Sequence, residues 1–215
     1  MNLKLKRMWL SGPVLVALVV QTQAAGLNLI DDTYGVGAGS FELGSFVDAG
    51  GYMRLAPGSG QLGGWTIGGD GADWLTAPYA RAAAGAMSLD LAAQTAGWIE
   101  TTIPTVAGAV FNVAFDSYAG QQPNTGLLRF GSSAPEAFSP VTALEAADAI
   151  YQRFVYSFVA SSDSTVLRFE AASTSGFGPV IDNVSVDSNA IPEPSSVASI
   201  GLVGLFGLWL RRKLR

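Results

Sequence analysis

The chain has 215 residues, 49% of them hydrophobic, which is enough for one domain with a substantial core. It contains no cysteine and no histidine, so disulfides, thiol chemistry and any catalytic set built on these residues are excluded. The formal net charge is −5, from 12 basic and 17 acidic residues.

The first 24 residues have the features of a secretory signal peptide. Basic residues near the start precede an apolar stretch from Val14 to Val20, and the small residues Thr22 and Ala24 stand where signal peptidase would read. An uncleaved membrane anchor is the alternative, since a Ser-Gly-Pro sequence opens the apolar stretch. In both cases we expect residues 25–190 to lie outside the inner membrane.

The segment 25–190 is strongly acidic once the basic ends are set aside. It holds five arginines against 16 acidic residues, which gives a net charge of −11. Such a domain repels nucleic acid and anionic lipid, so its expected partners are cations or neutral polymers.

Alternating apolar and polar residues in this segment predict strands with one buried face. The residues expected on buried faces are Met87, Leu89 and Leu91; Phe111, Val113 and Phe115; Phe154, Tyr156 and Phe158; and Thr165, Leu167 and Phe169. Turn-forming clusters separate these runs, and only residues 141–149 show a weak helical period. Many short strands broken by turns predict an all-β antiparallel β-sandwich, of jelly-roll type.

A series of motifs in this segment resembles the choice-of-anchor C family of bacterial surface proteins. The motifs are Gly39–Glu42 (GSFE), Gly63–Ile67 (GGWTI), Asp73-Trp74, Ser88–Leu91 (SLDL), Gly97–Thr102 (GWIETT), Phe111–Asp116 (FNVAFD), Leu167–Phe169 (LRF) and Gly178–Val186 (GPVIDNVSV). Two positions depart from the family pattern, because Ala38 often is Asn and Glu100 often is Gln in the family. The resemblance implies a galactose-binding-like jelly roll, akin to plant cell-wall domains and carbohydrate-binding modules.

Two acidic residues are candidates for a metal site. Alternation places Asp182 on the same face as Val180, Val184 and Val186, where a carboxylate is costly without a cation or several donors. Glu42 belongs to the first strand motif, and in such sandwiches the first and last strands are commonly neighbours. The resemblance to carbohydrate-binding jelly rolls implies a structural calcium held by Glu42 and Asp182, an all-oxygen site. The alternative is that Asp182 accepts hydrogen bonds from turn amides.

Three aromatic residues are candidates for ligand contact, because sugar faces stack on exposed rings. Trp74 follows the loop-like sequence Gly-Asp-Gly-Ala-Asp, and Tyr118 ends a strand beside Gly-Gln-Gln-Pro-Asn. Trp98 shares a strand face with Glu100 and Thr102, so we expect it to face solvent.

The last 25 residues, 191–215, form a distinct tail. An Ile-Pro-Glu-Pro sequence precedes 14 apolar residues from Val197 to Leu210, and a basic cluster ends the chain. A stable transmembrane helix needs roughly 20 apolar residues, so this run is short for an ordinary tail anchor; a tail anchor and a buried core helix are the alternatives to a processing signal. The tail resembles the PEP-CTERM sorting signal, in which a short transmembrane helix is held in the inner membrane until an exosortase cuts near Pro-Glu-Pro. The residues assigned to the signal are Pro192, Glu193, Pro194, Arg211, Arg212 and Lys213.

Together these features predict a signal peptide (1–24), a β-sandwich ectodomain (25–190) and a sorting tail (191–215). The expected protein is an exported, non-catalytic surface or biofilm-matrix protein of a Gram-negative bacterium, with exopolysaccharide as a candidate ligand. Its precursor is anchored in the inner membrane, and the product lies in the periplasm, on the cell surface or in the extracellular matrix. Signal peptidase and an exosortase-type enzyme are the expected processing partners. Nucleic acid is not expected to be a binding partner. The alternative is a jelly-roll glycan hydrolase that uses two of the 16 acidic residues as a carboxylate pair.

Overall fold

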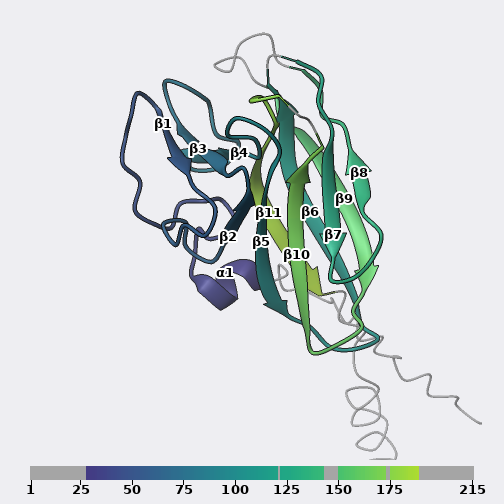
Figure 1. The fold of residues 1–215 in the computed structure, drawn as a ribbon. Helices are drawn as coiled ribbons and strands as arrows, with labels where there is room; N and C mark the ends of the chain where they lie inside the picture. The colour runs from purple at the N-terminus through teal and green to yellow at the C-terminus, as the bar shows by residue number, and fades with distance from the viewer. Residues whose placement is uncertain (1–27, 121, 143–149, 173–174, 189–215) are drawn as a thin grey trace, which may run out of the picture.

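The structure, a computed structural model, describes residues 28–120, 122–142, 150–172 and 175–188. Two antiparallel sheets pack face to face (Figure 1). The strands are β1 (Tyr52–Leu55), β2 (Thr66–Gly69), β3 (Ala72–Thr76), β4 (Met87–Asp90), β5 (Gly97–Pro104), β6 (Val110–Ala119), β7 (Gly126–Phe130), β8 (Glu136–Phe138), β9 (Gln152–Val159), β10 (Ser164–Ala171) and β11 (Pro179–Ser188). The six-stranded sheet has the order β1-β3-β4-β11-β6-β9, and the five-stranded sheet has the order β2-β5-β10-β7-β8. The predicted all-β antiparallel sandwich of jelly-roll type is confirmed.

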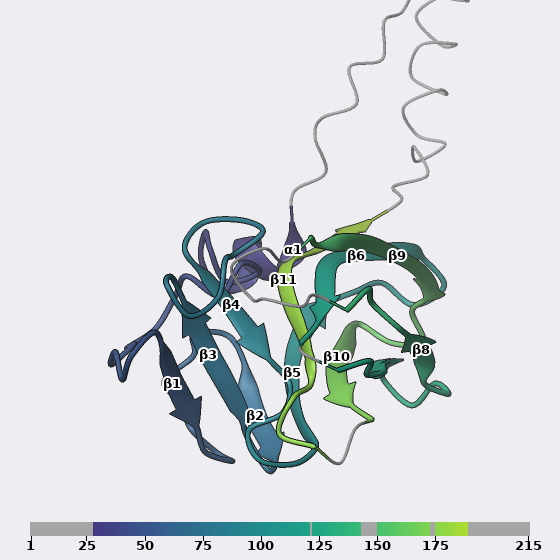
Figure 2. The ribbon, with the colours of Figure 1, turned by 90° about the horizontal axis from the view of Figure 1, so that it is seen from above.

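A short helix, α1 (Leu29–Tyr34), packs beside the last strand. Asn28 caps this helix by accepting a hydrogen bond from the amide of Ile30, at 3.2 Å. The same side chain donates to the carbonyl of Val184 at 3.0 Å and accepts from the amide of Val186 at 3.1 Å. The start of the described chain therefore lies beside the C-terminal part of β11 (Figures 1 and 2).

The main core lies between the two sheets, and the predicted strand faces supply it. Phe115 on β6 is fully buried and meets four aromatic rings from three other strands. Its partners are Phe138 at 4.9 Å, Phe169 at 5.0 Å, Phe154 at 5.4 Å and Tyr156 at 6.1 Å between ring centroids. The alternation seen in the sequence thus places Phe115 and Phe169 in the core and packs Phe154 and Tyr156 against it, as predicted, whereas Phe138 lies outside the predicted set.

A β-bulge interrupts strand β11 and changes which of its residues share a face. The register with β6 shifts between Asp182 and Ser185, and Asn183 adopts a φ of 51°. Val184 and Val186 consequently point into the main core. Asp182 lies instead on the outer side of the six-stranded sheet, as does Val180. The prediction that Asp182 shares a face with Val184 and Val186 is therefore wrong, because strict alternation does not pass through a bulge.

Candidate functional site

The outer face of the five-stranded sheet carries a row of polar and aromatic residues, which we call the outer strip. It consists of Thr66 on β2, Trp98, Glu100 and Thr102 on β5, and Arg168 on β10. Strand pairing sets Glu100 directly between Thr66 and Arg168. The intervening residues on these strands, such as Ile67 and Ile99, point into the core. The sequence predicted that Trp98, Glu100 and Thr102 share one face, and the structure confirms this placement.

Trp98 is half-buried and lies flat against its cross-strand neighbour. That neighbour is Gly68, where an added Cβ would lie only 2.0 Å from an atom of the indole ring, so glycine is required. The Arg168 guanidinium carbon lies 3.8 Å from the centre of the indole, as in a cation–π contact. Two nitrogens of Arg168 also donate to one carboxylate oxygen of Glu100, at 2.9 and 2.7 Å. Indole, guanidinium and carboxylate are thus held in one fixed array.

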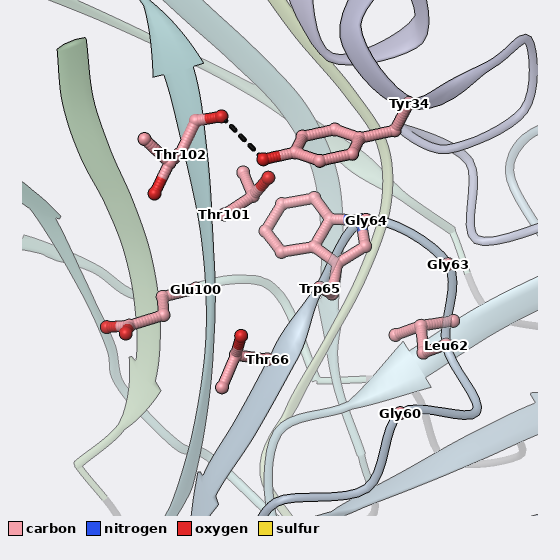
Figure 3. Close-up of a pocket in the computed structure, with 10 residues that line it drawn as sticks. All are labelled: Tyr34, Gly60, Leu62, Gly63, Gly64, Trp65, Thr66, Glu100, Thr101 and Thr102. Atoms are coloured by element: carbon pink, nitrogen blue, oxygen red, sulfur yellow. Dashed lines mark hydrogen bonds between the residues drawn. The ribbon is translucent and has the colours of Figure 1, made fainter.

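A pocket with a volume of about 340 Å³ adjoins the outer strip (Figure 3). It is lined by Tyr34, Gly60, Leu62, Gly63, Gly64, Trp65, Thr66, Glu100, Thr101 and Thr102. It forms where the pairing of β2 with β5 stops, because the chain before Thr66 diverges from β5. The Tyr34 hydroxyl donates to the carbonyl of Thr102 at 2.7 Å, and the Trp65 indole donates to the carbonyl of Ala38 at 2.9 Å. Both aromatic walls are therefore anchored. The sequence gives no local signal for this pocket.

Two of the three predicted ligand-contact aromatics are buried. Trp74 is 1% exposed, and its indole donates to the carbonyl of Phe41 at 3.0 Å. Tyr118 is 2% exposed and packs edge-on against Tyr151 at 5.0 Å, and burial raises the pKa of its hydroxyl. Neither ring presents a face to solvent, so the expectation that they stack on a ligand is corrected. Trp74 follows a loop-like sequence, but it lies within β3 beneath Phe46.

The predicted calcium ligands, Glu42 and Asp182, meet at the same loop, residues 77–86. One Asp182 oxygen accepts from the amides of residues 83 and 84, at 2.7 and 2.8 Å. One Glu42 oxygen accepts from the amides of residues 86 and 87, both at 2.8 Å. Glu42 lies in irregular backbone just after the turn that follows α1, so its predicted place in a first strand is wrong. The carboxylates together hold the loop over the six-stranded sheet, and the turn-amide alternative describes the contacts of Asp182.

Comparison with known proteins identifies the family. Residues 36–187 match the family model described as "Protein of unknown function (DUF642)". The chain belongs to the DUF642 family. Residues 190–213 match the PEP-CTERM protein-sorting motif, in agreement with the sorting tail expected from the sequence. The narrower resemblance to the choice-of-anchor C family stays a prediction.

Solved structures similar to this DUF642 protein include carbohydrate-binding modules. The module TmCBM61, solved with β-1,4-galactotriose, is 12% identical, with a TM-score of 0.47, over 58% of this chain and 88% of that one. A family 35 carbohydrate-binding module from Clostridium thermocellum is 12% identical, with a TM-score of 0.45, over 63% of this chain and 96% of the module. A cyclase from Fischerella sp. is 12% identical, with a TM-score of 0.49, over 73% of this chain and 95% of the cyclase. No curated protein matches the sequence. These likenesses concern the fold.

The predicted signal peptide (1–24) and the sorting tail of this DUF642 protein lie outside the described residues. The residues assigned to the sorting signal therefore also lie outside the described ranges; they are Pro192, Glu193, Pro194, Arg211, Arg212 and Lys213. Within the described ranges, no helix has the length and apolar character needed to cross a membrane.

Calcium binding by the DUF642 domain stays a prediction. In the part of the chain that the structure describes, no three acidic residues gather as a metal-ligand group. If calcium binds through Glu42 and Asp182, millimolar calcium should raise the melting temperature relative to chelator, and Asp182→Ala should abolish the shift. Melting curves that superimpose with and without calcium would leave the two carboxylates as loop anchors alone.

Asp182 should make the stability of the DUF642 domain depend on pH. Burial raises its pKa from the ordinary 3.8 to about 7, although the amides of the 77–86 loop oppose the shift. The folded chain therefore keeps a proton that the unfolded chain releases, and the resulting stabilisation is full below about pH 4 and lost as the pH rises through about 7. The domain should melt at a higher temperature at pH 5 than at pH 8.

The variant Asp182→Asn isolates this effect, because its side-chain oxygen still accepts from the loop amides but does not titrate. Thermal melts of both proteins from pH 4 to pH 8 are the measurement. The difference between pH 5 and pH 8 should shrink in the variant. An equal difference in both proteins would assign the pH dependence to other groups.

Proposed function

We propose that this DUF642 protein is an exported, non-catalytic surface or matrix protein that binds uncharged polysaccharide through the outer strip and its pocket. The PEP-CTERM motif indicates export through the cell envelope of a Gram-negative bacterium and processing by an exosortase-type enzyme. The motif supports the proposed location outside the inner membrane. The geometry of the five-stranded sheet supports the proposed polysaccharide ligand.

The observation that carries the proposal is the fixed array of Trp98, Arg168 and Glu100. A sugar ring offers flat patches of C–H groups and a rim of hydroxyls, which suit a planar aromatic or guanidinium surface beside hydrogen-bonding groups. The side chains of Arg168 and Glu100 keep 31% and 28% exposure, so both have free polar edges.

Charge favours an uncharged polymer. Each of four arginines already pairs with an acidic residue: Arg54 with Asp73, Arg129 with Glu170, Arg153 with Asp116 and Arg168 with Glu100. The exported segment as a whole carries a charge of −11. A uronic-acid polymer would therefore meet repulsion with few free cations to offset it.

The test is a retention assay on the exported protein, purified from the cell envelope. We expect affinity electrophoresis to show retardation in a neutral galactan, xylan or β-glucan gel and none in alginate. A reducing-sugar assay on the same polymers should show no release. Binding to none of the neutral polymers would contradict the proposal, and sugar release abolished by replacing a single acidic residue would favour a hydrolase.

A further inference from the structure

Thr101 carries a buried hydroxyl that has no hydrogen-bond partner among the described residues. The residue is 3% exposed and lies on the core side of β5, at the wall of the pocket. Figure 3 shows its oxygen directed between Tyr34 and Trp65, into the space that these two rings flank. A buried hydroxyl without a partner costs free energy, and a ligand group that bonds to it would recover that cost.

The walls around this hydroxyl are held in place before any ligand binds. The Tyr34 ring packs on Gly64, where the positive φ of 80° and a Cβ position 2.8 Å from the ring leave room only for glycine. Its hydroxyl bond to Thr102 links α1 to β5 across one side of the pocket. On another side, the amide of Gly63 donates to the carbonyl of Leu43 at 2.8 Å. A polymer passing straight through would have to break the link between Tyr34 and Thr102.

Building on the proposed function, we propose that the pocket receives the terminal residue of an uncharged glycan chain. The hydroxyl of Thr101 is then the specificity-determining contact, and the outer strip contacts the residues that follow. The volume of about 340 Å³ lies near the lower end of the roughly 300–1,000 Å³ typical of ligand pockets, so it suits a short segment of chain.

The chemistry of the lining selects for hydroxyl groups. No basic side chain is among the ten lining residues, and the one acidic side chain, Glu100, is already paired with Arg168. A threonine hydroxyl both donates and accepts, as a sugar hydroxyl does, so the two can satisfy each other. A terminal uronic acid would bring a negative charge next to Glu100 without a free cation.

The decisive variant is Thr101→Val, which removes the hydroxyl and keeps the shape of the side chain. Because this hydroxyl has no partner in the free protein, the melting temperature should stay the same or rise. The dissociation constant for an oligosaccharide should rise about tenfold, the effect of losing one good hydrogen bond. The probes are galacto-, xylo- and cello-oligosaccharides of two to six residues, titrated into the exported protein by calorimetry.

Thr165→Val is the matched control, since Thr165 is also a buried threonine in the same sheet. Its hydroxyl lies 3.1 Å from that of Thr105, so its loss should lower the melting temperature and leave glycan affinity unchanged. The opposite pattern, with Thr101→Val melting lower and binding as tightly as the wild type, would overturn the inference.

Chain-end recognition is tested by shortening the polymer. For equal masses of one neutral polysaccharide, limited hydrolysis to chains about ten times shorter should raise the number of binding sites about tenfold. If the number of sites follows mass, and only Trp98→Ala weakens binding, the pocket inference fails while the proposed function stands. If the wild type binds no neutral glycan, both fail.

Discussion

Replacing Phe115 by alanine is expected to lower the free energy of unfolding by roughly 3–5 kcal/mol, the range for a buried phenylalanine truncated to alanine. Phe115 is fully buried on β6 and contacts rings from β8, β9 and β10. It therefore joins the six-stranded sheet to the five-stranded sheet. Alanine would leave a cavity between the sheets and remove aromatic contacts that add to the buried area.

Urea unfolding followed by tryptophan fluorescence measures this change. The control is Val155→Ala on β9, because that side chain is 63% exposed and its loss should cost less than about 0.5 kcal/mol. A loss below about 1 kcal/mol for Phe115→Ala would contradict the packing described for the core.

Replacing Trp98 by alanine is expected to weaken polysaccharide binding about 30-fold or more. A well-packed aromatic anchor at the centre of a contact surface typically contributes about 2 kcal/mol when truncated, which corresponds to this factor in the dissociation constant. The loss would be larger than that of a simple contact, because Arg168 stacks on this ring and would lose its support. Stability should fall only modestly, since Trp98 is half-buried at the sheet surface.

Tyr79→Ala is the matched control for the aromatic change. Tyr79 is 49% exposed, but it belongs to the loop that covers the other sheet, and its ring packs at a tilt against Tyr52. Affinity electrophoresis in a neutral polysaccharide should separate the two variants. Equal binding by Trp98→Ala and the wild type, or a larger loss of affinity in Tyr79→Ala, would show that the binding surface is not the outer strip.

Period-two alternation was sufficient to predict the fold class and the faces of regular strands such as β5 and β6. Phe111, Val113 and Phe115 are buried together on β6 because successive side chains in a strand point to opposite faces. The same rule places Trp98 and Glu100 on one outer face of β5. These features depend on residues close together in sequence, so the alternation of apolar and polar residues is enough to predict them.

Features that depend on distant segments were beyond the sequence pattern. The bulge at Asn183 turns Val184 inward, and its backbone is fixed by Asn28 and by a hydrogen bond to Gly39 at the other end of the chain. Trp74 is buried by residues 41–46, which lie some 30 positions earlier in the chain. The pocket likewise needs α1, the glycine-rich segment before β2, and β5 to meet.

The most direct test of polysaccharide binding is an NMR titration of the isotope-labelled exported protein with a soluble neutral polysaccharide. The account predicts amide shift changes in β2, β5 and β10 around Thr66, Trp98 and Arg168, with little change in β6 and β9. Shift changes confined to the six-stranded sheet, or no changes with galactan, xylan or β-glucan, would contradict it.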